Sequence, residues 1–220
     1  MAKTSYREQI YEDYRGRIQR GEIDQSTRLV DKNIADQLGV SRMPVREALM
    51  QLAHEGYLEG TSRGFALPNL SDRQVLEVFE LRRLLEPYAA GMAAQTITDQ
   101  SISRLRDAVT DTMRALEADD VSLLFKAIEL FRNTWLGSVP NTELKNTIHR
   151  YHAQVRTVRV ATMQDPEIRN VLVKGQFDLY EAFTRRDSML AMNQMQVFVQ
   201  HGKESYLRCM SQVPDSTDCG

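Results

Sequence analysis

Two arginines in the N-terminal third of the chain carry the clearest chemical signal in the sequence. Arg42 and Arg46 stand four residues apart, so on a helix their side chains share one face. A guanidinium can donate two hydrogen bonds to the edge of a guanine, and each such contact adds about 1–3 kcal/mol of base discrimination. Because an isolated arginine pair is more often part of an ordinary solvated surface, the segments around it must decide the interpretation.

The surrounding residues predict two helices joined by a tight turn, after an amphipathic helix in the first 20 residues. Residues 31–39, DKNIADQLG, indicate a short helix that begins at Asp31 and ends at Gly39. Ser41 suits the N-cap of the next helix, whose apolar residues recur at helical spacing. These apolar residues are Val45, Ala48, Leu49 and Leu52. Such a turn places the second helix across the major groove of DNA.

A β-hairpin is predicted directly after the paired helices. Tyr57-Leu58 and Phe65-Ala66-Leu67 are short β-prone pieces on either side of a glycine-rich segment. The tip, Arg63-Gly64, can enter the neighbouring minor groove, where glycine permits a close approach. Further candidate DNA contacts, at the start of the two helices, are Lys32, Ser41 and Met43.

Composition and charge limit the possible classes of protein but do not identify one of them. Hydrophobic residues make up 42% of the chain and charged residues 26%, which is ordinary for a globular protein. Residues 1–70 hold ten Lys or Arg and ten Asp or Glu, so a DNA-binding interpretation rests on where the basic residues lie. No apolar run of about 18 residues and no secretory signal occur, so we expect no membrane segment and a cytoplasmic location. Cys209 and Cys219 stand in no metal-ligand spacing.

From Ser71 onward every segment favours a helix, beginning with a long one that Pro87 is expected to kink. Further helices are predicted over residues 99–118, 121–138, 142–162, 167–186 and 187–210. The fold class is therefore mainly α, with a winged helix-turn-helix of three helices and a β-hairpin followed by an all-α antiparallel bundle. We assign residues 1–70 to the first domain, 71–212 to the second and 213–220 to a flexible tail.

The first domain resembles the DNA-binding domain of the GntR family of bacterial regulators. The run LVDKNIADQLGVSRMPVREALMQLAHEGYLEGTSRGFAL carries the resemblance, because it follows the family's LGVSRxPVREAL, LxxEGxL and wing patterns. The resemblance implies a homodimer that binds a palindromic operator in double-stranded DNA. By analogy, the expected DNA contacts are Lys32, Ser41, Arg42, Met43, Arg46, Arg63 and Gly64.

The second domain resembles the all-helical effector domain of the FadR-type branch of that family. The resemblance is carried by ELRRLLEPYAAGMAA, FRNTWLGSVPNTEL and AFTRRDSMLAMNQM. Many members hold a metal there through an aspartate and three histidines. The matching positions here are Ile128, Arg132, Gln176 and Phe198. Isoleucine and phenylalanine cannot ligate a cation and a guanidinium offers no lone pair, so we expect no metal and no cofactor. The alternative ligand is His201, one turn beyond Phe198.

Arg132 is the informative departure from the metal pattern. A guanidinium at the position of a cation can bind a carboxylate by a two-pronged contact, so the hypothesis is a small acidic effector, an organic acid. The further lining residues would be Arg82, Gln176 and Tyr180. The alternative is that Arg132 pairs with an internal acid, either Glu129 or Glu86, in a small or filled cavity.

Three functions follow from these patterns, and the first is favoured. It is a sequence-specific transcriptional regulator, a repressor, that responds to a small molecule. The second is a metal-dependent helical ligand-binding protein or an enzyme with an accessory winged helix, although no nucleophile–base pair or phosphate loop stands out. The third uses the winged helix as a protein-interaction module.

Overall fold

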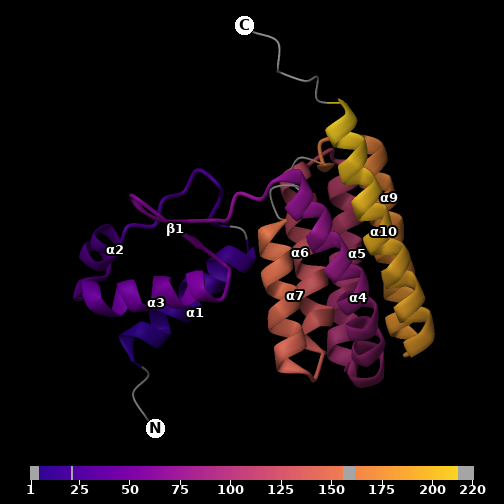
Figure 1. Ribbon diagram of the computed structural model, residues 1–220. Coiled ribbons are helices and arrows are strands. Elements are labelled where there is room, and N and C mark those ends of the chain that lie inside the picture. Colours follow the sequence, from indigo (N-terminus) through magenta and orange to yellow (C-terminus); the bar gives the residue numbers. More distant parts are fainter. Residues whose placement is uncertain (1–4, 21, 156–161, 213–220) are drawn as a thin grey trace, which may run out of the picture. The chain divides into compact units, whose positions relative to one another are not determined.

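The computed structural model describes residues 5–20, 22–155 and 162–212, whose course Figure 1 shows. The chain divides into two compact units. Among the described residues, the first comprises residues 5–20, 22–72 and 149–155, and the second comprises residues 73–148 and 162–212. The first unit is a winged helix-turn-helix and the second a helical bundle, so the predicted fold class is confirmed. The predicted tail, 213–220, lies outside the described residues.

Three helices lie wholly within the first unit: α1 (Tyr6–Arg20), α2 (Asp31–Leu38) and α3 (Arg42–His54). Both α1 and α2 pack against α3. The predicted apolar stripe of α3 is wholly enclosed, at Val45, Ala48, Leu49 and Leu52. Burying one such leucine or valine side chain contributes about 1.5–3 kcal/mol. The inner face therefore holds α3 in place, and its other face is left to solvent.

A two-stranded antiparallel hairpin, the wing, follows α3. Strand β1 (Glu59–Thr61) pairs with β2 (Gly64–Ala66) in a register that opposes Thr61 to Gly64. Leu29 adds a further rung, because its N–H and its C=O each form a 2.8 Å hydrogen bond to the backbone of Phe65. The wing is thereby tied to the segment between α1 and α2.

The first strand begins later than the sequence predicts. Tyr57 and Leu58 are 3% and 2% exposed and belong to the core of the first unit. Their backbone N–H groups both donate to the carbonyl of Leu52, at 2.9 and 3.3 Å. The chain is thus still leaving α3 at the two residues for which the sequence predicted extended backbone.

All regular structure described beyond residue 71 is helical, as predicted. The helices are α4 (Asp72–Thr96), α5 (Asp99–Glu117), α6 (Val121–Gly137), α7 (Thr142–Gln154), α9 (Pro166–Thr184) and α10 (Ser188–Gln212). The helix α4 continues through Pro87 as one element. The helix predicted over 142–162 is described as far as Gln154, and residues 156–161 of it lie outside the described part. No described helix is both long enough and apolar enough to cross a membrane.

The bundle core joins helices that are distant in the sequence. In Figure 1 the bundle helices run side by side, and α5 packs against both α6 and α9, while α9 packs against α10. The ring of Trp135 on α6 stacks on Phe183 of α9 with centroids 6.1 Å apart. Helices α4 and α10 meet at Gly91, where an added Cβ would lie 2.7 Å from Met192 Cγ. The absence of a side chain at Gly91 therefore allows the two helices to approach closely.

Candidate nucleic-acid interface and effector site

A single glycine shapes the turn between α2 and α3. Gly39 ends α2 with φ +66°, and nothing lies within 4 Å of the place that its Cβ would take. The glycine is therefore needed for its left-handed backbone and not for space. Ser41 occupies the N-cap of α3 as predicted, but its side chain makes no capping hydrogen bond. Its hydroxyl is not committed to the helix and can serve a phosphate.

The outer face of α3 carries the predicted base-reading side chains. Arg42, Met43 and Arg46 are all exposed and lie outside the buried stripe. Among the described residues, Arg46 forms no ion pair. The helix-turn-helix thus presents one arginine without an acidic partner, close to the N-terminal end of an exposed helical face.

Arg42, in contrast, is held by an acid. Its Nη2 lies 2.9 Å from Oδ1 and 3.0 Å from Oδ2 of Asp31. Asp31 Oδ1 also accepts a hydrogen bond from the backbone N–H of Lys32 at 2.7 Å. The ion pair joins the first residue of α3 to the first residue of α2. The sequence assigned Asp31 only to the start of a helix, because two residues eleven positions apart meet only when the turn has folded.

The wing presents Arg63 at its tip. Its backbone N–H donates to Thr61 Oγ1 at 3.2 Å, and the Thr61 hydroxyl donates to the carbonyl of Gly64 at 3.0 Å. Gly64 has φ +119°, and a Cβ there would lie 2.4 Å from the carbonyl oxygen of Leu29. The fold itself therefore requires a glycine at this position. Close approach of Gly64 to DNA, the reason inferred from the sequence, stays a prediction.

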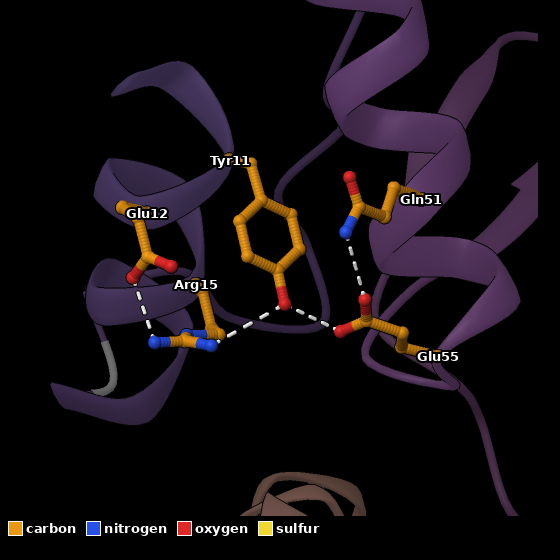
Figure 2. Close-up of polar contacts among 5 residues, drawn as sticks. All are labelled: Tyr11, Glu12, Arg15, Gln51 and Glu55. Atoms are coloured by element: carbon orange, nitrogen blue, oxygen red, sulfur yellow. Dashed lines mark hydrogen bonds and ion pairs between the residues drawn. The ribbon is translucent and has the colours of Figure 1, made fainter. Parts of the chain in front are cut away.

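A polar network joins α1 to the C-terminal end of α3 (Figure 2). The Tyr11 hydroxyl donates to Glu55 Oε2 at 2.5 Å and accepts from Arg15 Nη1 at 3.3 Å. Gln51 Nε2 donates to Glu55 Oε1 at 3.0 Å, and Arg15 Nη2 bonds to Glu12 at 2.7 Å. Burial, with the bond to Glu55, raises the pKa of Tyr11 to about 12. The sequence pattern gives Tyr11 only as an apolar position of the first helix. It does not predict the hydrogen bonds that the Tyr11 hydroxyl forms.

Both arginines of the predicted effector site are buried in the bundle and paired with acids. Arg132 forms an ion pair with Glu129, three residues earlier on α6. Arg82 Nε donates to Glu86 Oε1 at 2.5 Å on α4. Of the two acids considered for Arg132, Glu129 forms an ion pair with it, and Glu86 forms an ion pair with Arg82. Each arginine thus has an acidic partner on its own helix.

The two other predicted effector residues differ in burial. Gln176 is 2% exposed, and neither atom of its amide has a hydrogen-bond partner among the described residues. A buried amide without partners is costly, so Gln176 is a candidate for a ligand-binding group. Tyr180, one turn further along α9, is half-buried, and its ring lies 6.5 Å from that of the exposed Phe177. Tyr180 is therefore the more peripheral of the two.

The positions that the resemblance assigns to metal ligands do not fit a cation. They are occupied by Ile128, Arg132, Gln176 and Phe198. His201 lines a groove of about 520 Å³ between α9 and α10, together with Glu204 and Phe198. Within the described ranges, no group of three or more His, Cys, Asp or Glu side chains is placed to hold a metal ion.

A winged helix-turn-helix with arginines on its outer face, joined to a helical domain with buried polar side chains, defines a class of bacterial regulatory protein. Two family profiles match the chain. Residues 6–64 match "Bacterial regulatory proteins, gntR family", and residues 77–201 match the FCD domain. The chain belongs to the GntR family and carries an FCD domain, the arrangement typical of the FadR-type subfamily.

Two relatives and one solved structure show the extent of the likeness. The chain is 31% identical over 133 residues to the HTH-type transcriptional regulator McbR of Escherichia coli, an alignment that spans 60% of this chain and only 60% of that relative. It is 27% identical over 200 residues to the E. coli HTH-type transcriptional repressor RspR, across 90% of this chain and 87% of the relative. The solved structure of E. coli McbR/YncC has a TM-score of 0.77 at 23% identity, and covers 94% of this chain and 99% of that one. At 23% sequence identity, this structural likeness establishes the fold alone.

Proposed function

We propose that the chain is a sequence-specific DNA-binding transcriptional regulator, acting in the cytoplasm as a homodimer on a palindromic operator. The observation that carries the proposal is the exposed surface of α3, where Arg42 and Arg46 lie outside a fully buried apolar stripe. In this arrangement α3 enters the major groove and the arginines read base edges. Lys32 and Ser41 contact phosphates, Met43 lies against base edges beside the arginines, and Arg63 with Gly64 approaches the minor groove. Repression is the proposed effect, supported by a relative that is named a repressor.

Selection of DNA from a random duplex pool tests this function. The full chain should enrich a palindromic sequence, because each copy of α3 in a homodimer reads one half-site. Arg46→Ala should relax the selected sequence at one symmetric pair of positions. Arg114→Ala is the matched control, since it removes an arginine that is 70% exposed on α5. Association that is equally strong for every sequence would contradict the proposal and favour a protein-interaction module.

We further propose that a small acidic metabolite binds in the bundle and changes the affinity for DNA. Buried Arg132 and the unpartnered amide of Gln176 support this assignment. Glu129 engages Nη2 of Arg132, so an incoming carboxylate would share the guanidinium with that acid. Arg82 and Tyr180 complete the proposed lining, and no resident metal is part of the proposal.

Isothermal titration with a panel of organic acids tests the effector site. We expect one or more acids to bind the wild type and to bind Arg132→Ala at least tenfold more weakly, as for the loss of a charge-assisted contact of about 1.5–3 kcal/mol. Gln176→Leu is a second variant that leaves the Arg132–Glu129 pair in place and gives up no hydrogen bond in the described structure. Equal binding by the wild type and both variants would remove these residues from the site.

A further inference from the structure

Asp31 is an acid in the middle of the surface proposed to meet DNA. It directly precedes Lys32 and is bonded to Arg42, two of the proposed DNA contacts. A carboxylate is repelled by phosphates and by itself weakens DNA binding. The side chain of Asp31 is only 15% exposed, while that of Arg42 is 60% exposed. The acid is thus mostly covered and the guanidinium that it holds is mostly open.

We propose that Asp31 is a positioning residue that sets sequence specificity through Arg42. It holds the guanidinium in one orientation toward the base edges, and it offsets the charge that would otherwise attract phosphates of any sequence. The inference rests on the proposed DNA-binding function and adds to it the residue that separates specific from non-specific binding.

The geometry leaves Arg42 able to bind a base while it is held. Asp31 engages only Nη2, and a guanidinium has further N–H donors on Nη1 and Nε. Asp31 is itself fixed by the 2.7 Å hydrogen bond from the Lys32 N–H, at the N-terminal end of α2, where the helix dipole favours a carboxylate. The anchor of Arg42 is therefore part of the helix-turn-helix framework and not a mobile surface acid.

An arginine without this anchor would behave differently on DNA. It would sample many orientations and bind phosphates wherever they lie, which strengthens binding to all sequences and steepens the dependence on salt. An arginine held in place loses less freedom when it meets the correct base.

Asp31→Asn tests the inference, because asparagine keeps an oxygen for the Lys32 N–H and removes the charge. Binding is measured by fluorescence anisotropy in the full chain, on the duplex selected by the wild type and on a shuffled duplex of the same composition. We expect the shuffled duplex to bind about two- to fivefold more tightly. Its salt slope should steepen by roughly one phosphate contact. The ratio of selected to shuffled affinity should fall by about fivefold or more.

Three further variants separate positioning from charge and from folding. Asp36→Asn removes the same charge from an exposed position of α2 that has no ion pair in the described structure, and should leave the affinity ratio unchanged. Asp31→Glu should retain most of the ratio, since it keeps the charge. In an Arg42→Ala background, Asp31→Asn should no longer change the ratio. Thermal unfolding of each variant confirms that the first unit remains folded.

The inference would be overturned if Asp31→Asn raised the affinity for both duplexes by the same factor. A general effect of charge would then explain the result without any positioning of Arg42. An effect that persists without the Arg42 side chain would also overturn the inference. Either result would leave the proposed DNA-binding function intact. If instead the wild type selects no sequence at all, the proposed function fails, and the inference fails with it.

Discussion

At the scale of single residues, two buried arginines of the bundle are paired with buried acids. Arg132 pairs with Glu129 and Arg82 with Glu86, each within one helical turn. Such pairs are set by spacing along a helix, so the charges can be balanced before the helices pack. Removing one partner leaves the other charge buried, at a cost of about 3–5 kcal/mol. Arg132→Ala therefore tests stability as well as ligand binding, which is why Gln176→Leu accompanies it.

Tyr11→Phe should destabilise the first unit. The change removes the donor to Glu55 and leaves that carboxylate, at the C-terminal end of α3, without its shortest hydrogen bond. We expect the free energy of unfolding to fall by about 1–2 kcal/mol, somewhat less than for a fully buried charged hydrogen bond. Denaturant unfolding of the full chain measures it, with Tyr6→Phe as control because Tyr6 is 63% exposed. Equal losses for both variants would contradict a special role for Tyr11.

The raised pKa of Tyr11 predicts an alkaline loss of stability. In the unfolded chain a tyrosine loses its proton near pH 10, and in the folded chain Tyr11 loses it near pH 12. Because the folded state binds this proton more tightly, its contribution is complete below pH 10 and is lost as the pH rises from about 10 to about 12. The stability of the wild type should therefore fall more steeply across that window than that of Tyr11→Phe. Parallel curves for the two proteins would contradict the assignment.

At the scale of elements, α3 is held in place at both ends. Its N-terminal end is tied to α2 by the Arg42–Asp31 pair, and its C-terminal end is tied to α1 by Tyr11 and Glu55. Between them, the enclosed apolar stripe fixes the rotation of the helix. The reading face can therefore be presented to DNA as a rigid surface, which is what specific base contacts need.

The wing depends on glycine at one position and not at another. Gly64→Ala would bring a Cβ to 2.4 Å from the carbonyl oxygen of Leu29, in a backbone conformation with φ +119°. We expect a loss of about 1–3 kcal/mol in the free energy of unfolding, together with weaker operator binding. Gly60→Ala on β1 meets nothing within 4 Å and should be neutral or slightly stabilising. Denaturant unfolding measures the free energy of unfolding of both variants. An unchanged value for Gly64→Ala would contradict the prediction, because it would show that the Leu29–Phe65 backbone pair can move to make room for a Cβ.

At the scale of the whole molecule, the proposed function requires two copies of the chain. We expect light scattering to give twice the 25.3 kDa mass of one chain in solution. The selected operator should have two half-sites whose centres are about 34–36 Å, or a multiple of that, apart along the DNA. A single chain bound to one half-site would contradict the homodimer while leaving DNA binding in place.

The helical elements were largely predictable because their signals are local. Helices α5 and α6 begin at residues 99 and 121, as predicted, and the residues before them, Thr98 and Asp120, each accept a hydrogen bond from a backbone N–H three residues later. The wing was predicted less well. Tyr57 and Leu58 have β-prone side chains, but tertiary burial and bonds to Leu52 hold them outside the strand. Propensity describes a residue's own preference, and here packing outweighs it.

The sequence by itself determined the class of this protein: a glycine-containing turn between two short amphipathic helices, a hairpin, and a long helical remainder. These features depend on spacing and local backbone preference, which the order of residues contains directly. Only the tertiary structure decided which partner each polar side chain takes. Asp31 holds Arg42, Tyr11 holds Glu55, and Gly64 makes room for Leu29, because residues far apart along the chain become neighbours only when their elements pack.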